Sequence, residues 1–221
     1  MAKPWYLMDI AAYEALSSEI EAKYPDLRCA LENGKALVMG YYPVCGDGQV
    51  LDRYLIRLVL PPDSIRGLPV LYETSGRIAR DAAHHMSEDG AACVVLPDAF
   101  WHDHPDGMTP VEFLDGPVRS YLASQSLVEK GEDGAWPSGE WGHGVDGIVE
   151  FYGSILGFTD ISIVLAFLKV LAGDVVKGHW NCPCGSHKRI RDCHFALILD
   201  LRKRIPRQVA AKSAAILVTR R

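Results

Sequence analysis

The pattern of apolar and polar positions predicts one helix and then a run of strands in the first third of the chain. Between residues 9 and 22, Leu16 and Ile20 recur at helical spacing, and Asp9 precedes them as a candidate N-cap. Asn33-Gly34 is a hairpin turn pair. Three strand-like segments follow it, at 35–44, 50–60 and 68–72. A helix followed by a short antiparallel meander is typical of an α+β fold.

The regular pattern stops between residues 73 and 107. This segment is polar and rich in His, Asp, Gly and Ala, with one short apolar stretch at 93–96. A loop of this length is uncommon in a compact domain and is usually functional when it occurs. The helical pattern resumes at the capping box 109–112, which has Pro110 in the first helical position. Gly116-Pro117 is expected to bend or restart that helix.

The second half of the chain is predicted to be helical. A glycine-rich polar loop at 129–144 leads to helices at about 146–156 and 160–172. The second of these helices is apolar almost all round, which is typical of a buried helix. A last apolar segment, 208–219, is also expected to be ordered.

Charge separates the C-terminal part from the rest of the chain. Residues 177–221 carry 11 Lys+Arg and 2 Asp+Glu, whereas residues 1–176 carry 12 Lys+Arg and 26 Asp+Glu. The two parts therefore have charges of opposite sign within a net charge of −5. The composition, 48% hydrophobic and 23% charged, is globular and excludes collagen-like and wholly disordered classes. The sequence contains neither an apolar run that would span a bilayer nor a signal-peptide core, so we expect a cytoplasmic protein without membrane attachment. The predicted parts are a first domain at 1–125, a loop and helical extension at 126–176, and a small C-terminal module with a basic tail at 177–221.

A cluster of thiols and one imidazole lies at the start of the basic part. Cys182, Cys184, Cys193 and His194 form the ligand set of a closed structural zinc site, and Gly185 lets the backbone turn tightly between them. In a cytoplasmic chain, such a cluster indicates metal binding rather than disulfides. The stretch NCPCGSHKRIRDCH resembles the SEC-C motif, a short zinc-binding module at the ends of many bacterial proteins. The resemblance implies Zn²⁺ as a structural cofactor and an interaction surface rather than catalysis.

Cys93 is the candidate nucleophile. Four histidines lie within 11 positions of it: His84, His85, His102 and His104. A nucleophilic thiol needs partial exposure, a lowered pKa and a neighbouring group that stabilises an oxyanion. The alternative is that Cys93 is a small buried hydrophobic residue.

The order of elements up to about residue 125 resembles the ubiquitin-conjugating-enzyme fold. The residues that carry this resemblance are Asp89-Gly-Ala-Ala-Cys93-Val-Val-Leu96 and the following Trp101. The likeness is to bacterial ubiquitin-conjugating-like proteins of antiphage operons, including those built around a cyclic-oligonucleotide synthase (CBASS), and of ubiquitin-like conjugation operons. It implies that Cys93 is the catalytic residue. The family's His-Pro-Asn element is absent, and His85 occupies the position of the Asn that stabilises the oxyanion.

The resemblance implies a thioester carrier. Cys93 would accept the C-terminal glycine of a ubiquitin-like protein or of a cyclic-oligonucleotide synthase, from an activating enzyme or directly from an activated tail. A lysine amine would then attack, with His102, Asp103 or His104 orienting or deprotonating it. The alternative is a noncatalytic protein- or nucleic-acid-binding adaptor on the same fold, with the basic tail contacting phosphates.

Two other classes of cysteine site fit the sequence poorly. A zinc deaminase is excluded because no His-x-Glu pairs with a Pro-Cys-x-x-Cys motif. A papain-like protease is disfavoured because its catalytic cysteine opens a long helix near the N-terminus, whereas Cys93 is followed by a strand-like Val-Val-Leu. The thioester carrier and the adaptor are therefore the two predictions that the structure has to address.

Overall fold

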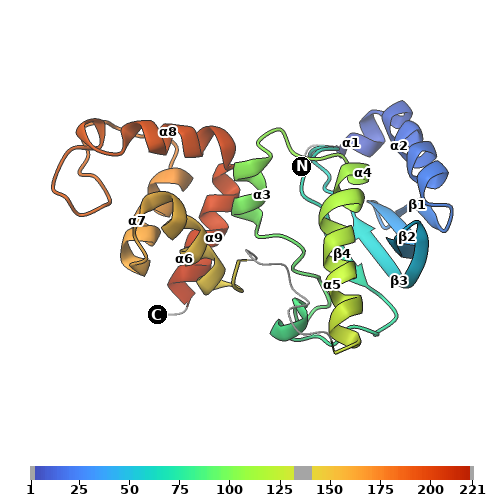
Figure 1. Ribbon diagram of the computed structural model, residues 1–221. Coiled ribbons are helices and arrows are strands. Elements are labelled where there is room, and N and C mark those ends of the chain that lie inside the picture. The colour runs from blue at the N-terminus through green and yellow to red at the C-terminus, as the bar shows by residue number, and fades with distance from the viewer. Residues whose placement is uncertain (1–2, 132–140, 220–221) are drawn as a thin grey trace. The chain divides into compact units, whose positions relative to one another are not determined.

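The computed structural model describes residues 3–131 and 141–219, and these divide into two compact units. The first unit comprises 3–94 and 107–131 of the described residues, and the second comprises 95–106 and 141–219 (Figure 1). The segment 95–106 therefore belongs to the second unit although the chain around it belongs to the first. Part of the predicted glycine-rich loop, residues 132–140, lies outside the described residues.

A four-stranded antiparallel sheet with the strand order β1-β2-β3-β4 forms the centre of the first unit. Its strands are β1 (Leu27–Glu32), β2 (Lys35–Gly46), β3 (Gln49–Val59) and β4 (Val70–Glu73). At the turn between β1 and β2, Asn33 and Gly34 have φ values of 50° and 73°, as a two-residue hairpin requires. The predicted meander is confirmed, and β1 adds an edge strand that the sequence pattern did not predict.

Two of the helical runs of the first unit begin at the predicted signals, Asp9 and the capping box at 109–112. The helices of this unit are α1 (Trp5–Met8), α2 (Ile10–Lys23), α4 (Pro110–Phe113), the π-helical turn η2 (Leu114–Val118) and α5 (Arg119–Glu129). Asp9 accepts a hydrogen bond from the backbone N–H of Ala12, as an N-cap does. Thr109 and Glu112 form both bonds of the capping box. Pro117 lies inside η2, so the predicted irregularity is a wide turn within one continuous helical run.

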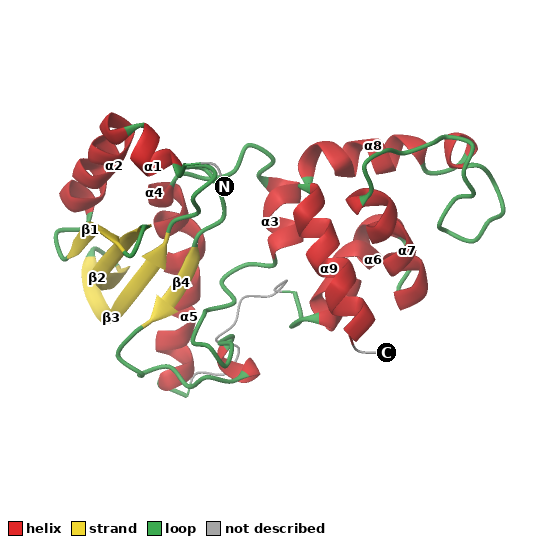
Figure 2. Ribbon diagram, turned by 180° about the vertical axis from the view of Figure 1, so that it is seen from behind, coloured by secondary structure: helices red, strands yellow, loops and turns green. Residues whose placement is uncertain are grey.

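One face of the sheet packs against η2 and α5. The hydroxyl of Tyr42 donates to the carbonyl oxygen of Leu114 at 2.7 Å. The hydroxyls of Tyr54 and Ser126 lie 3.1 Å apart. Figures 1 and 2 both show α5 running along the sheet. These buried tyrosines contribute apolar area to the core, and each retains a polar partner for its hydroxyl.

The second unit is helical. Its elements are α3 (Pro97–Asp103), α6 (Val145–Leu156), α7 (Ile161–Ala172), the short η3 (Ile190–Asp192), α8 (Phe195–Arg204) and α9 (Arg207–Thr219). Val164, Phe167 and Leu168 of α7 are fully buried, which confirms the predicted buried helix. Within the described ranges, no single helix is long and apolar enough to cross a membrane, although α6 and α7 together, bent by 80° at their junction, meet the length and composition requirement.

A buried carboxyl group links three helices of the second unit. Asp98 of α3 is 1% exposed and accepts hydrogen bonds from Tyr152 of α6, at 2.7 Å, and from Ser213 of α9, at 2.5 Å. Burial raises the pKa of Asp98, and the two hydroxyl donors oppose that shift. The short helix α3 is therefore held by side-chain bonds to its own unit.

Replacing Asp98 tests this linkage. Asp98→Ala leaves the hydroxyls of Tyr152 and Ser213 without their acceptor in the core, which should lower the free energy of unfolding of the second unit by about 2–4 kcal/mol. Asp200→Ala is the control, because it removes an exposed partner of Arg204 and should cost less than about 1 kcal/mol. Urea denaturation followed by circular dichroism measures both. Equal losses in the two variants would show that the buried carboxyl group does not link the helices.

Candidate metal centre and candidate thiol site

The four predicted metal ligands converge at one point of the second unit. The donor atoms of Cys182, Cys184, Cys193 and His194 all lie within 4.8 Å of one another. His194 Nδ1 is 3.2 Å from Cys182 Sγ and 3.1 Å from Cys193 Sγ, and the Sγ atoms of Cys184 and Cys193 are 3.6 Å apart. Two thiolates bound tetrahedrally to one ion lie about 3.8 Å apart. Three sulfurs and one nitrogen at this spacing could hold a metal ion.

A short backbone hairpin sets the spacing of these ligands. The N–H of Cys182 donates to the carbonyl oxygen of Lys188 at 2.8 Å, and Asn181 pairs with Arg189 in an isolated bridge. Gly185, with φ of 77°, forms the turn between the two arms. The hairpin thus brings the two cysteines of its first arm to the start of α8.

Packing against α7 orients the imidazole of the cluster. The ring of His194 lies edge-on to Phe167, with ring centroids 5.4 Å apart, and Phe167 is fully buried.

Two thiols of the cluster differ in their pKa values. Burial raises the pKa of Cys182 to about 11. Burial also opposes ionisation of Cys184, but hydrogen bonds from the side chain and backbone of Ser186 outweigh it and lower the pKa of that thiol to about 6. Cys184 is therefore more readily ionised than Cys182.

In the first unit, Cys93 lies at the edge of the sheet beside β4. The backbone N–H of Ala92 donates to Leu71 of β4 at 2.8 Å, and Ala92 also pairs with Met86 in an isolated bridge. The N–H of Cys93 donates to the carbonyl oxygen of His85 at 2.7 Å. Cys93 itself is exposed. The structure thus brings together Cys93 and His85, two of the predicted site residues, through a backbone bond.

Helix α5 fixes the position of the loop that precedes Cys93. The carbonyl oxygen of His84 accepts from the hydroxyl of Tyr121 at 3.0 Å and from the side-chain amide of Gln125 at 2.5 Å. Gln125 is fully buried, and its amide also donates to Tyr121. Its Oε1 has no hydrogen-bond partner among the described residues. Two side chains of α5 therefore hold the carbonyl group of His84 in place.

A second set of bonds orders the segment that follows β4. The buried carboxylate of Glu73 accepts from the backbone N–H groups of Gly76, at 2.9 Å, and Arg77, at 3.0 Å. Arg77 forms ion pairs with Asp52, at 2.6 Å, and Glu129, at 2.5 Å. Its guanidinium group also lies 4.3 Å from the ring centre of Tyr54. The segment lacks periodicity but is ordered by charged and polar contacts.

The electrostatic surroundings of Cys93 keep its thiol protonated. Partial burial raises the pKa of Cys93 above the ordinary value of a thiol, and the negative charge of Asp89 raises it further. Asp89 is held by the hydroxyl of Ser87, at 2.5 Å, and by the N–H of Ala91, at 3.1 Å, and these bonds lower its own pKa. The loop thus presents a permanent negative charge beside an exposed thiol.

The other predicted site residues belong to the second unit. His102 and Asp103 close α3 and are joined by a bond of 2.8 Å between Nδ1 and the carboxylate. The ring of His104 lies 5.6 Å from that of Phe100. The role predicted for His102, Asp103 and His104 at the Cys93 thiol stays a prediction.

In comparisons with known proteins, no protein-family model, no curated protein and no solved structure matches the chain. The likeness to ubiquitin-conjugating enzymes and to the SEC-C motif therefore remains an interpretation of the residues. The α+β character, the four-stranded antiparallel sheet and the Cys/His cluster are properties of this structure.

Sequence reasoning missed the residues that hold the Cys93 loop. Glu73, Tyr121 and Gln125 carry no motif. Glu73 binds backbone groups that follow it closely in the chain, whereas Tyr121 and Gln125 bind a backbone carbonyl of a distant segment. The one available signal was Gln125 itself, a polar residue in the helical run between Leu122 and Leu127. The pattern alone did not indicate which face of that run is buried.

The pH dependence of alkylation tests the surroundings of Cys93. Iodoacetamide reacts with the thiolate, so a raised pKa should place the inflection of the rate above the ordinary thiol pKa. Asp89→Asn removes the negative charge and should move the inflection to lower pH, with faster labelling at neutral pH. Asp81→Asn, which instead removes an exposed partner of His84, should leave the inflection in place. Mass spectrometry of the peptide with Cys93 gives the rates. An inflection below the ordinary value would contradict the account.

Proposed function

We propose that the first unit is a cysteine-dependent acyl carrier with Cys93 as the nucleophile. The observation that carries the proposal is the exposed Cys93 thiol, held at the edge of the sheet in a loop that α5 binds through the carbonyl of His84. Preorganisation of this kind favours covalent catalysis because a reacting acyl group meets the sulfur in one fixed position. The helix, the antiparallel meander and the following thiol loop also support the likeness to ubiquitin-conjugating enzymes.

The proposed reaction has two balanced steps. The Cys93 sulfur attacks the carbonyl carbon of an activated C-terminal glycine and a C–S bond forms. The activating group, a thiol or a phosphate, leaves with the electron pair and takes up the proton that the Cys93 thiol loses. A lysine amine then attacks the thioester, a C–N bond forms, the sulfur leaves, and the amine gives up a proton. The resemblance assigns His85 to the oxyanion of both tetrahedral intermediates. The role of His102, Asp103 or His104 at the incoming amine stays a prediction from the sequence.

The acyl donor is assigned by the same resemblance. It is the C-terminus of a ubiquitin-like protein or of a cyclic-oligonucleotide synthase, delivered by an activating enzyme or by its own activated tail, in bacterial antiphage defence.

For the second unit, the proposal is a structural Zn²⁺ site at the Cys/His cluster. Three thiolates and one imidazole make a closed ligand set without a position for substrate, so the ion would crosslink the hairpin to α8 and supply folding energy. The resemblance to the SEC-C motif assigns this module to partner recognition.

A noncatalytic adaptor is the second candidate function. The raised pKa of the Cys93 thiol favours it, because no group that is shown to act on that thiol lowers its pKa. Its nucleic-acid form is less favoured, because Arg202 and Arg207 of the basic tail donate to backbone carbonyls of their own unit. Arg207 also pairs with Asp174. Part of the positive charge is therefore already used inside the second unit.

Adduct formation in the native host separates the carrier from the adaptor. The wild type should give a band on non-reducing gels that a thiol reductant removes, and Cys93→Ala should abolish that band. Cys45→Ala is the matched control because Cys45 is also an exposed thiol of the first unit, and it should keep the band. Partners that co-purify equally with all three proteins, without any adduct, would favour the adaptor.

Metal analysis tests the zinc proposal. The purified wild type should contain about one Zn²⁺ per chain, and Cys193→Ser should lose most of it with a lower melting temperature of the helical signal. Cys45→Ser should retain the metal because Cys45 is outside the cluster. Equal metal content in all three proteins would place the ion elsewhere.

A further inference from the structure

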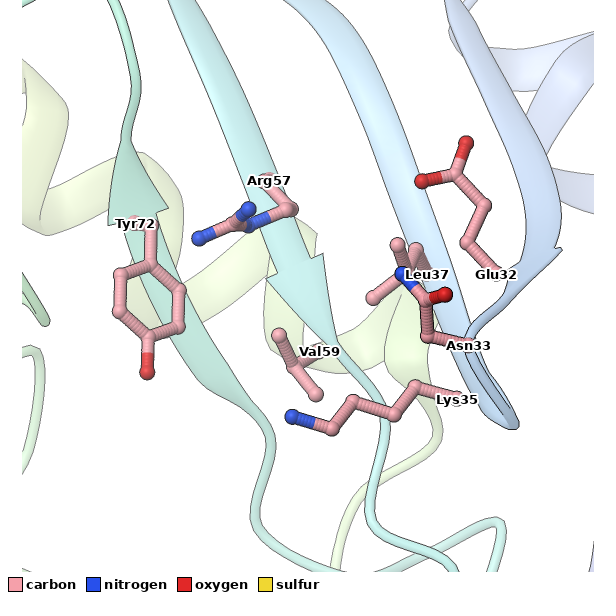
Figure 3. A pocket seen from close by; sticks show the side chains of 7 residues that line it. All are labelled: Glu32, Asn33, Lys35, Leu37, Arg57, Val59 and Tyr72. Carbon is pink, nitrogen blue, oxygen red and sulfur yellow. The ribbon is translucent and has the colours of Figure 1, made fainter.

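A depression on the sheet of the first unit has no part in the chemistry proposed at Cys93. It has a volume of about 180 Å³. It is lined by Glu32, Asn33, Lys35, Leu37, Arg57, Val59 and Tyr72 (Figure 3). Its lining combines two cations, one carboxylate, one amide, one aromatic ring and two aliphatic side chains.

The strand register explains this grouping. Leu37 of β2 pairs with Val59 of β3, and Arg57 pairs with Tyr72 of β4. Lys35 lies two residues before Leu37, so alternation places its side chain on the same face as that of Leu37. Figure 3 shows the side chains of Lys35, Arg57 and Tyr72 around Val59. Leu37 and Val59 form the floor of the depression, and Lys35 of β2 and Arg57 of β3 lie beside it.

The two cations differ from four others of the first unit in their ion pairing. Lys23, Arg53, Arg66 and Arg77 each have a carboxylate partner. For Lys35 and Arg57, by contrast, no ion pair occurs among the described residues. The guanidinium group of Arg57 lies 4.8 Å from the ring centre of Tyr72, a contact that leaves its N–H donors available. The carboxylate of Glu32 points away from the ammonium group of Lys35 in Figure 3.

We propose that this depression binds a phosphate monoester that carries a planar organic group. A phosphate monoester has a charge between −1.5 and −2 at neutral pH, which roughly matches the two cations, and the fork of an arginine suits its oxygens. The planar group would lie on the Leu37–Val59 floor against the ring of Tyr72. This site is independent of the proposed chemistry at Cys93, so either proposal can fail without the other.

Titration of the full chain with phenyl phosphate tests the proposal. Chemical shifts of the ¹⁵N-labelled protein should change saturably for amides of β2, β3 and β4 around the depression. Lys35→Gln and Arg57→Gln should each weaken binding by about fivefold or more, because each removes a charged hydrogen-bond donor. Arg53→Gln is the matched control, because Arg53 lies on the same strand and the same face as Arg57 but is already paired with Asp26. This substitution should change the affinity by less than about twofold.

The choice of probes separates the two parts of the ligand. Inorganic phosphate should bind more weakly than phenyl phosphate, and phenol should produce no saturable change. Equal weakening by all three substitutions would show diffuse charge attraction and overturn the proposal. Shifts that grow without saturation, or that map away from the depression, would also overturn it.

Discussion

The fixed position of the Cys93 loop depends on one buried amide. Gln125 of α5 directs its donors at the carbonyl of His84 and the hydroxyl of Tyr121, and its own oxygen stays unpaired among the described residues. An unsatisfied buried oxygen costs about 1–3 kcal/mol, so the contacts around it must offset that cost. The hydroxyl of Tyr121 donates to the same carbonyl, so two side chains of α5 hold the loop that precedes the candidate thiol.

The two units order their irregular segments with different chemistry. The first unit orders an aperiodic segment with buried polar groups, of which Glu73 and Gln125 are the centres. In the second unit, the hairpin around Gly185 has few apolar side chains, and its cysteines meet one imidazole instead. Small elements that cannot bury enough apolar area commonly depend on a metal ion. A bound ion would therefore be part of that fold rather than an addition to it.

Much of the fold could be predicted because its signals are local. The turn at Asn33-Gly34, the capping box at 109–112 and the buried helix over 160–172 depend on neighbouring residues alone, and the structure confirms them. The Cys/His cluster was predictable for the same reason, since its ligands lie within 13 positions of one another and the hairpin between them is short.

The elements that the pattern missed are those that tertiary contacts decide. Strand β1, with the sequence LRCALE, has weak strand propensity and exists through its pairing with β2. Helix α3 has seven residues, too few for a clear period, and its Asp98 is buried because Tyr152 and Ser213 satisfy it. The support of Cys93 by Gln125 joins residues 41 apart through a backbone carbonyl of His84, which no side-chain motif can encode.

The acyl transfer proposed for Cys93 depends on the sulfur of that residue. The most direct test replaces the sulfur by oxygen. In Cys93→Ser, a transferred acyl group would form an oxyester, which resists thiol reductants but is cleaved by mild base. We expect such an adduct in the native host, with the ester mapped by mass spectrometry to position 93. An adduct mapped to another side chain, or a wild-type adduct that persists in reductant, would contradict this proposal.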